Sequence, residues 1–585
     1  FRLALYNMGP CHISYQFTLF TQFTGLTMSF QLPEKKLNLG VPISPTTAVE
    51  VSSSFAALDY FPEFSASSKK VICSMGLRRA AIRLLSGGTR SGGHRCISSS
   101  SALTAGDSIV GGSNCDRSVG SRDFLDWLKS GDKRISTPLS QPLPGIQPER
   151  PGLPPLVPPP TQITVLDNGV RVISEASPGP TASLGLYINS GSIYETPQNS
   201  GCSALLECLG FKATTHRPTL RIMKEVEKFG NTIVANASRE QMSYTIDCLK
   251  TGFPAALELL LDCVLNPAFE AQEVEEQKMR LAMLLGGKDI HATLMTELLT
   301  RAAYRGPYGN PLIPDPDSMA RITPDELRSF VARHFIAPHM VLAAAGVEHQ
   351  ELVTLAKPML EGLPKVAPLP EPKPEYVGGF VHLPGSYAQS NLLLAFEYAG
   401  GWRDVHGAVV MTVFNYLLGG GNSFSSGGPG KGMHSRLYTR VLNKYGFVHS
   451  CASFNSTFNE SGMVGIQAAS DPNRVAEMLN IMCSELEAVE NGTNRVELER
   501  AKRSAVSVIC NALESKATSA EDIGRQYLTY GHRISGRTYV EMLEAVTQDD
   551  IRRFVRRLLS SKPSLAAYGD RTETIDPYIL TRRYG

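Results

Sequence analysis

The sequence predicts an α+β protein made of two homologous halves, each a mostly antiparallel sheet with helices packed on one face. Two observations support this class. Segments of alternating apolar and polar residues, typical of strands with one wet face, are interspersed with longer segments of helical period. In addition, a capped helix followed by a short apolar strand occurs twice along the chain.

Composition excludes several classes of protein. The chain has 585 residues, and its 57 basic and 55 acidic side chains give a formal charge of +2, unlike a basic nucleic-acid coat or an acidic tail protein. No apolar stretch approaches the roughly 20 residues that cross a bilayer. The 11 cysteines include no CxxC pair, so neither a disulfide framework nor a zinc knuckle is indicated. We expect a reducing compartment, no nucleic-acid partner and no direct membrane span.

Two segments before the folded body are expected to have no regular structure. Residues 1–74 show no sustained helical or strand period and stay unassigned, as an over-extended gene model or a disordered segment. Residues 107–160 are expected to be a disordered, Pro-rich spacer, because ten prolines lie between Pro138 and Pro160. The folded body is therefore expected to begin near Thr161.

Residues 75–106 have the composition of a mitochondrial transit peptide. They contain five arginines and no Asp or Glu. On a helical wheel Arg79 and Arg83 lie opposite an apolar face, which consists of Leu77, Ala80, Ala81, Leu84 and Leu85. A disordered basic tail would explain the charge but not this apolar face, so targeting is the favoured interpretation.

The first half, residues 161–362, opens with a hairpin signal. Two short apolar runs flank Asp167, Asn168 and Gly169, and an Asn-Gly pair supplies the positive φ angles of a tight primed turn. We therefore expect a two-residue turn between two antiparallel strands.

Helices and a further strand follow the hairpin. Residues 201–212 read as a buried helix, and a second helix is expected to close at Gly230 in the left-handed conformation. Residues 242–248 alternate apolar and polar side chains, the period-two pattern of a strand.

A repeat defines the second half. Residues 322–333 form a Thr-capped, acid-led helix pattern before an apolar strand, and residues 546–557 repeat that pattern before residues 565–569. The repeat predicts a duplication. Its second copy, residues 376–585, follows a Pro-rich linker over residues 363–375.

The sequence lacks a zinc-binding motif. Catalytic zinc needs about three protein ligands, but none of the 12 histidines forms HExxH or the inverted HxxEH. His334 and His339 are the nearest pair; they flank Pro338 before a core strand and are expected to be satisfied loop histidines.

Residues 201–212, GCSALLECLGFK, resemble the zinc helix of the pitrilysin-type metallopeptidases, in particular the mitochondrial processing peptidases. Catalytic members carry His-x-x-Glu-His there, and the match puts Ala204 and Cys208 at the two histidine positions, so that Glu207 alone remains. The family's third ligand is a later Glu, yet residues 279–288 contain no carboxylate. Without a metal-bound water to deprotonate, Glu207 is not expected to be catalytic, and we expect no metal site and no cofactor in this chain.

A second feature is a glycine-rich loop over residues 419–432. A phosphate-binding P-loop is excluded, because Ser425 and Gly432 stand where that motif needs Gly and Ser or Thr. Composition alone would favour a disordered linker. The loop, however, resembles the glycine-rich loop of the α-type subunits of processing peptidases, and the resemblance implies contact with substrate by Gly419, Gly420, Gly421, Phe424, Gly427, Gly428, Gly430, Lys431 and Gly432. The role of Lys431 stays open between an acidic partner surface and solvent.

Further segments, residues 237–251, 340–352 and 520–531, also resemble the α type, so the resemblance covers residues 161–585. It implies a non-catalytic, substrate-recognising subunit in the mitochondrial matrix, which binds presequence peptides together with a zinc-bearing β subunit. The α-type segments look most like the plant type, and that resemblance implies an alternative: a structural core subunit of the cytochrome bc1 complex, peripheral on the inner membrane, or both roles in one protein. A self-sufficient peptidase is disfavoured by Ala204 and Cys208.

Overall fold

The structure is a computed structural model. It describes residues 159–285, 291–367, 369–385, 387–423, 432–576 and 578–584. The expectations for residues 1–74, 75–106 and nearly all of 107–160 fall outside this set. Within it, no helix combines the length and the apolar character that a membrane crossing requires.

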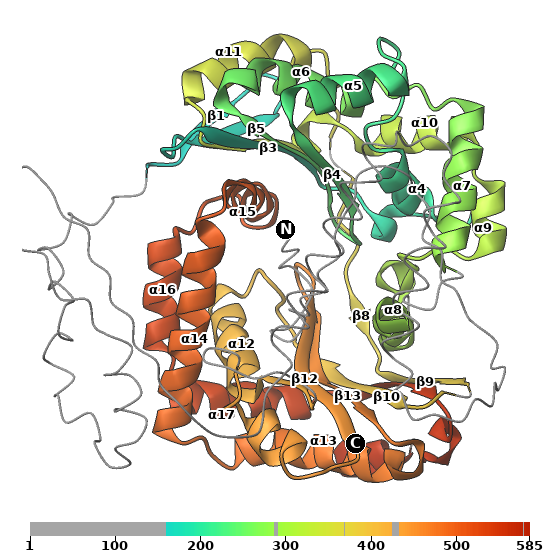
Figure 1. The fold of residues 1–585 in the computed structure, drawn as a ribbon, viewed down its shortest axis with the longest axis vertical. Coiled ribbons are helices and arrows are strands. Elements are labelled where there is room, and N and C mark those ends of the chain that lie inside the picture. Colours follow the sequence, from blue (N-terminus) through green and yellow to red (C-terminus); the bar gives the residue numbers. More distant parts are fainter. Residues whose placement is uncertain are drawn as a thin grey trace, which may run out of the picture. The chain divides into compact units, whose positions relative to one another are not determined.

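The first half contains a six-stranded sheet in the order β1-β2-β7-β3-β5-β4 (Figure 1). All neighbours are antiparallel except β2 and β7, which run parallel. The strands are β1 (Gln162–Val165), β2 (Arg171–Glu175), β3 (Thr181–Ile188), β4 (Thr232–Ala237), β5 (Met242–Leu249) and β7 (Met340–Ala345).

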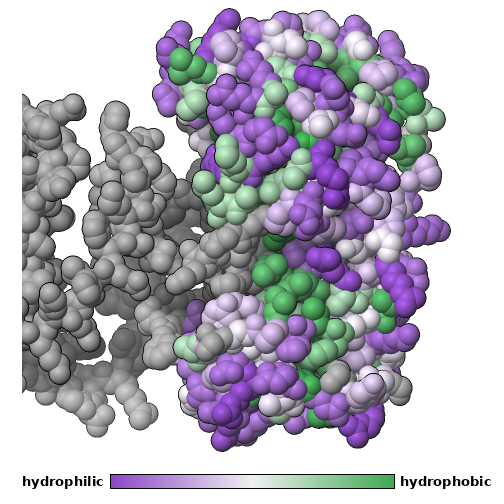
Figure 2. Space-filling view, turned by 90° about the vertical axis from the view of Figure 1, so that its right-hand side faces the viewer, coloured by the Kyte–Doolittle hydropathy of each residue, from purple (hydrophilic) through white to green (hydrophobic). Residues whose placement is uncertain are grey.

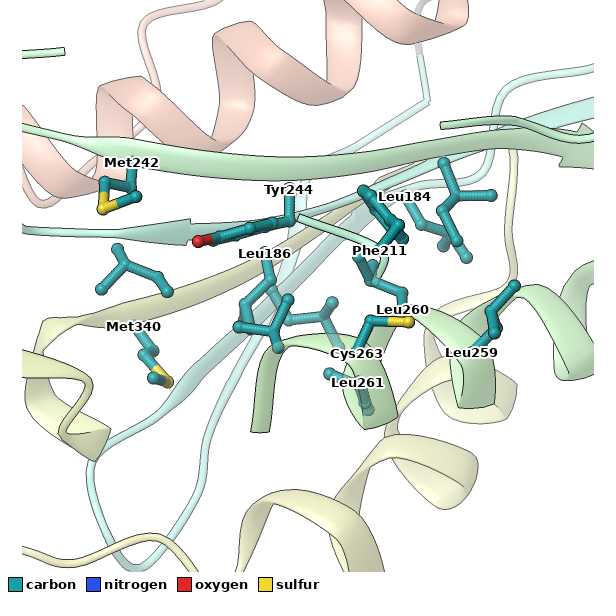
Figure 3. Close-up of a cluster of buried hydrophobic side chains, with 14 of the residues drawn as sticks. Leu184, Leu186, Phe211, Met242, Tyr244, Leu259, Leu260, Leu261, Cys263 and Met340 are labelled. Carbon is teal, nitrogen blue, oxygen red and sulfur yellow. The ribbon is translucent and has the colours of Figure 1, made fainter. Parts of the chain in front are cut away.

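The helices of the first half are α4 (Cys202–Leu209), α5 (Thr219–Phe229), α6 (Phe253–Leu265), α7 (Ala271–Leu285), α8 (His291–Ala303), α9 (Pro316–Arg321), α10 (Pro324–His334) and α11 (His349–Leu360). Of these, α4, α5, α6, α7, α10 and α11 contribute to the core on one face of this sheet. Figure 3 shows how Leu184, Leu186 and Tyr244 of the strands point toward Phe211 and Leu260. Apolar burial between sheet and helices therefore stabilises this half.

The hairpin between β1 and β2 differs from the expected primed turn. Gly169 has a φ of 100°, but Asn168 is not among the positive-φ residues. The Leu166 amide donates to the Val170 carbonyl at 2.9 Å, so the loop is longer than two residues. The Asn168 side chain is buried and donates to the Leu360 carbonyl at 2.7 Å, which binds the hairpin to the end of α11. The hairpin therefore has a three-residue loop with glycine in the left-handed conformation, and the Asn168 side chain fixes this loop to α11.

The second half contains another six-stranded sheet, in the order β11-β12-β13-β10-β14-β9. Its strands are β9 (Gly379–Pro384), β10 (Ser390–Glu397), β11 (Gly420–Asn422), β12 (Val448–Thr457), β13 (Gly462–Ser470) and β14 (Ser564–Gly569). Its helices are α12 (Val405–Leu418), α13 (Val475–Glu490), α14 (Arg495–Leu513), α15 (Lys516–Thr529), α16 (Gly536–Ala545), α17 (Gln548–Leu559) and α18 (Tyr578–Tyr584). A small two-stranded sheet joins β6 (Tyr304–Arg305) to β8 (Glu375–Tyr376).

The two sheets share one topology, and this confirms the predicted α+β fold of two homologous halves. The run β2-β7-β3-β5-β4 and the run β9-β14-β10-β13-β12 have the same pairing directions, with one parallel pair at the same place in each. The repeated helices are α10 and α17, capped by the hydroxyls of Thr323 and Thr547. Strand β11 is an addition of the second half.

Each sheet also packs against one helix from the other half, which the sequence did not predict. Helix α15 lies on β2, β3 and β7, where Ile523 and Tyr527 join a cluster with Ile173, Tyr187 and Val341. Helix α8 lies on β9, β10 and β14. The cluster beneath it contains Met295, Leu299, Leu393, Ala566 and Tyr568. Each half therefore covers the second apolar face of the other.

A buried carboxylate also joins the halves. Both oxygens of Glu240, in the turn between β4 and β5, accept from the Asn459 amide at 2.9 and 3.0 Å, and the Tyr308 hydroxyl donates to one of them at 2.7 Å. Burial is the main reason that the pKa of Glu240 rises to about 7, although these hydrogen bonds oppose the rise.

The packing of α15 predicts the effect of Gly524→Ala. In a helix this change ordinarily stabilises by about 1 kcal/mol. Here a Cβ would lie 2.2 Å from the Tyr187 ring. We therefore expect a loss of about 2 kcal/mol in the free energy of unfolding, measured by urea denaturation. Gly446→Ala, with no atom within 4 Å of its Cβ, is the matched control and should change stability little. A stabilised Gly524→Ala protein would contradict the packing.

The buried Glu240 predicts a pH dependence of stability. Its pKa is raised from 4.5 to about 7 in the fold, so between these values the folded state binds more protons than the unfolded chain. Stability due to this group is therefore full below about pH 4.5 and falls as pH rises to about 7, by at most about 1.4 kcal/mol per pH unit. Glu240→Gln should lack this pH-dependent part of the stability. If the free energies of unfolding of wild type and variant differ by the same amount at pH 5 and at pH 8, the prediction is refuted.

Candidate functional site

Helix α4 is held by its apolar face and by a carboxylate at its N-terminus. Cys202, Leu205 and Leu206 are buried in the core of the first half. The two carboxylate oxygens of Glu195 accept from the amides of Gly201 and Ser203, both at 2.7 Å. These bonds satisfy amides that the first turn of a helix leaves free, and they favour the charged Glu195 against its burial. The helix is thus a rigid part of the fold.

Glu207 is bonded to the protein backbone. Its Oε2 accepts from the Ala237 amide at 3.0 Å, at the end of β4. Burial raises the pKa of Glu207, and this hydrogen bond partly opposes the rise. The carboxylate therefore joins α4 to β4, a structural role that does not require a metal.

The other two positions of the emptied motif offer no ligand set. Ala204 has no donor atom, and burial, followed by the charge of Glu207, raises the pKa of the Cys208 thiol and disfavours the thiolate that binds metals. Helix α7 packs beside α4, but its residues 279–284 carry no carboxylate. Among the residues that the structure describes, no group of three or more His, Cys, Asp or Glu is placed to hold a metal ion.

His334 and His339 do not form a site. The prediction of a satisfied loop histidine is wrong for His334, which is the last residue of α10. Its ring packs between Phe330 and Tyr194. Its Nδ1 has no hydrogen-bond partner in the described structure, and burial lowers its pKa to about 4. His339 is buried with its Nδ1 near the His334 carbonyl at 3.3 Å. Both rings serve as packing groups.

The first stem of the glycine-rich loop is fixed in the second sheet. Gly420, Gly421 and Asn422 form β11, which pairs with β12. Gly420 has a φ of 110°, and a Cβ at this position would lie 2.1 Å from the Cys451 carbonyl oxygen. The Gly420 amide also donates to the Ser435 hydroxyl at 3.0 Å, so the two ends of the loop meet. Glycine is therefore required at this stem by geometry.

The second stem is anchored by Arg436, which sequence reasoning missed. The side chain is buried and donates to Glu497 Oε2 at 3.0 and 3.1 Å and to the carbonyls of Ala488 and Gly492 at 3.2 and 2.8 Å. A π-helical turn, Tyr438–Leu442, follows this anchor. The only sign of this anchor in the sequence is a charged residue just after the glycine-rich stretch.

The structure thus describes four of the nine predicted contact residues, namely Gly419, Gly420, Gly421 and Gly432. The remaining five, which are Phe424, Gly427, Gly428, Gly430 and Lys431, lie outside the described residues.

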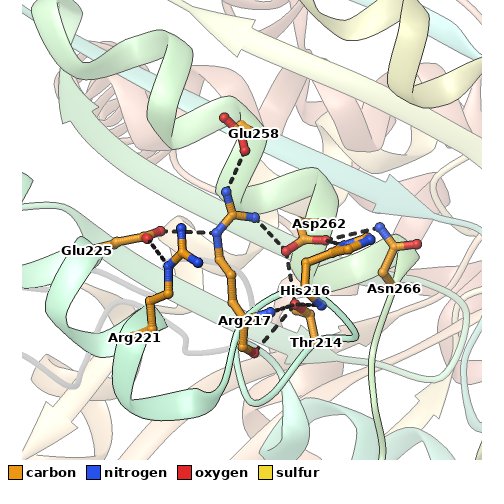
Figure 4. A network of polar contacts seen from close by, with 8 residues as sticks. All are labelled: Thr214, His216, Arg217, Arg221, Glu225, Glu258, Asp262 and Asn266. Atoms are coloured by element: carbon orange, nitrogen blue, oxygen red, sulfur yellow. Dashed lines mark hydrogen bonds and ion pairs between the residues drawn. The ribbon is translucent and has the colours of Figure 1, made fainter.

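A polar network lies near α6 (Figure 4). It lines a cleft of about 290 Å³. The Asp262 carboxylate accepts from Thr214, His216 and Arg217, and these bonds outweigh its burial and hold the pKa of Asp262 below the usual value. Arg217 is further paired with Glu225 and Glu258. Since the charges satisfy one another, we interpret the network as structural.

Comparison with known proteins agrees with this geometry. Residues 171–315 match the insulinase family, peptidase family M16, and residues 321–505 match the peptidase M16 inactive domain. The mitochondrial-processing peptidase subunit alpha of Solanum tuberosum is 44% identical over 451 residues, covering 76% of this chain and 89% of that protein. The probable subunit alpha-1 of Arabidopsis thaliana is 42% identical and the human subunit alpha 31% identical, each with the same coverage.

A duplicated α+β fold, in which Ala204 and Cys208 stand at the ligand positions of a zinc helix, defines the class as an M16-type protein. This chain belongs to peptidase family M16, among the α subunits of mitochondrial-processing peptidase.

The contact of Glu207 predicts a difference between two substitutions. Glu207→Ala leaves the buried Ala237 amide without its acceptor and should lower the free energy of unfolding by about 1–3 kcal/mol. Glu207→Gln keeps a carbonyl acceptor and should cost clearly less. Chemical denaturation of both variants measures this difference. Equal stabilities of the two variants would remove the structural role of Glu207.

Proposed function

We propose that this chain is the non-catalytic, substrate-recognising α subunit of the mitochondrial processing peptidase. In the mitochondrial matrix it acts with a zinc-bearing β subunit that removes N-terminal presequences from imported precursors. Helix α4 is the observation that supports the absence of catalysis most directly. The fold keeps this helix with Glu207, but Ala204 and Cys208 stand at the ligand positions. Zinc chemistry then has to come from the partner subunit.

The chain itself holds no cofactor in this proposal. A zinc-activated water needs about three protein ligands, and α4 together with α7 supplies no such set. Metal analysis of the isolated chain should therefore find less than stoichiometric zinc. A tightly bound divalent ion, or presequence cleavage without a partner, would overturn the assignment.

The glycine-rich loop is our candidate for substrate contact. Its two stems are held together by the bond between Gly420 and Ser435, and Arg436 fixes the second stem to the turn between α13 and α14. Residues 419–432 carry little side-chain bulk, so a bound peptide can be contacted through the backbone. Backbone contact tolerates many side chains, which suits a subunit that accepts varied presequences. Lys431 contacts an acidic surface of the partner or solvent.

A second role is a core subunit of the cytochrome bc1 complex, attached peripherally to the inner membrane. The observation that favours it is the identity of 40–44% to plant α subunits against 31% to the human one, because the plant type is the one in which the resemblance implies both roles. Co-purification with cytochromes b and c1 from native membranes would support this role. Complete separation from them would refute it.

Removal of residues 427–432 tests the recognition role. The purified αβ complex with this deletion should lose most presequence binding, by about tenfold or more in Kd, because the peptide loses its backbone contacts. Binding of a labelled presequence peptide, followed by fluorescence anisotropy, measures the effect. Gly446→Ala is a control outside the loop that should bind normally. Unchanged binding by an assembled deletion complex would overturn the role of the loop.

A further inference from the structure

Two lysines, one from each half, meet at the turn between β2 and β3. Lys516 is the first residue of α15, and its Nζ donates to the Ser177 hydroxyl and to the Pro178 carbonyl, the latter at 2.8 Å. Lys250 directly follows β5, and its Nζ donates to the Ser177 carbonyl at 3.1 Å. Both amines therefore bind the same short stretch of the first half, and Lys516 fixes the start of α15 to it.

This arrangement is unusual for lysine, which ordinarily extends into water or pairs with a carboxylate. Figure 2 shows an ordinary surface on the side of α7, where hydrophilic side chains predominate. The buried Lys278 of α7 and the buried Lys502 of α14 each pair with a glutamate, at 2.7 and 3.2 Å. Among the described residues, no carboxylate forms an ion pair with Lys250 or Lys516, whose partners at the turn are neutral oxygens.

The acids nearest in sequence do not compensate the two charges. Glu175 pairs with Arg533 at 3.1 Å. Glu514, at the end of α14, forms no ion pair with Lys516 in the described structure. Burial, followed by the charge of Lys250, lowers the pKa of Lys516. A larger fraction of this amine is therefore neutral than in a solvated lysine at the same pH.

The hydrogen bonds of Lys516 also suit a neutral amine. A neutral lysine has two N–H bonds and one lone pair, so the oxygens of Ser177 and Pro178 use both of its hydrogens and leave the lone pair free. The side chain is half-buried, so a reagent in solution reaches it. The neutral amine is the nucleophilic form of lysine.

We propose that Lys516 is an acylation site, which takes its acyl group from a thioester. The Nζ lone pair forms a bond to the thioester carbonyl carbon, the carbon–sulfur bond breaks, and the thiolate takes up the proton that the amine releases. The products are an amide and a free thiol, so the step needs no oxidant or reductant.

Acylation changes the contact between the halves. An acylated lysine carries no charge and only one N–H, so at most one of the two bonds from Lys516 to the turn persists. The modification therefore loosens the start of α15 from the first half. Since Lys516 lies in neither α4 nor the glycine-rich loop, this inference is independent of the proposed function.

The test incubates the purified αβ complex with acetyl-coenzyme A at about pH 8 and follows each lysine by mass spectrometry. Lys516 should be acetylated at least about threefold faster than Lys224, an exposed lysine of α5, because more of its amine is neutral. Lys250→Gln keeps a hydrogen-bond donor but removes the neighbouring charge, and should slow the reaction at Lys516 by about twofold or more. Lys250→Arg keeps the charge and should keep the rate. Neither variant should alter the rate at Lys224.

Two results would overturn the site. They are a rate at Lys516 no higher than that at Lys224, and equal rates at Lys516 in the Lys250→Gln and Lys250→Arg complexes. Hydrogen exchange measures the consequence, because amides in the first turns of α15 should exchange faster in the acetylated chain. Lys516→Arg keeps the charge without an acylatable amine, so treatment should leave its exchange unchanged. Unchanged exchange in the acetylated wild-type chain would overturn the loosening of α15.

Discussion

The constraint on which this fold depends is that each sheet has two apolar faces but only one set of its own helices to cover them. The second face is buried by a helix of the other half, α15 on the first sheet and α8 on the second. Neither half could expose that face to water without losing the burial that stabilises it. Polar contacts at Glu240 and Asn459 add a directional bond between the halves. The packing of the two halves against each other is therefore part of the folded state.

Burial also explains why α4 is kept in the fold although its ligand positions carry Ala204 and Cys208. Helix α4 lies in the core of the first half, with Glu195 at its N-terminus and Glu207 bonded to β4. Ala204 contributes no side-chain bond and Cys208 is half-buried, so ligand positions could change without opening the core. Glu207, in contrast, has a second role as a hydrogen-bond acceptor. The residue that remains of the motif is the one on which the structure also depends.

The sequence pattern predicted those elements whose conformation depends on residues close together in the chain. The alternating strand at Met242–Leu249 and the glycine that ends α5 with a φ of 64° both agree with the sequence prediction. The exchange of α8 and α15 could not be predicted, because an amphipathic helix shows that it has an apolar face but not which sheet will cover it.

Long-range bonds account for the other differences. The Asn168 side chain donates to the carbonyl of Leu360, far along the chain, and no local pattern predicts this contact. Of the candidate site, the emptied motif and the glycines were visible in the sequence. The role of Arg436 was not, because its acceptors, Glu497 and the carbonyls of Ala488 and Gly492, lie more than 50 residues further along the chain.

The duplication also relates the glycine-rich loop to the emptied zinc helix. In chain order α4 follows β3, and α12 follows β10, the strand equivalent to β3, so α12 is the counterpart of the emptied zinc helix. The segment that follows α4 folds into α5, which buries Ile222 and Val226 in the core. The segment that follows α12 instead forms β11 and the glycine-rich loop, whose low side-chain bulk leaves little to bury. The first copy of this connection therefore adds to the core, whereas the second is the element to which we assign substrate contact in the proposed function.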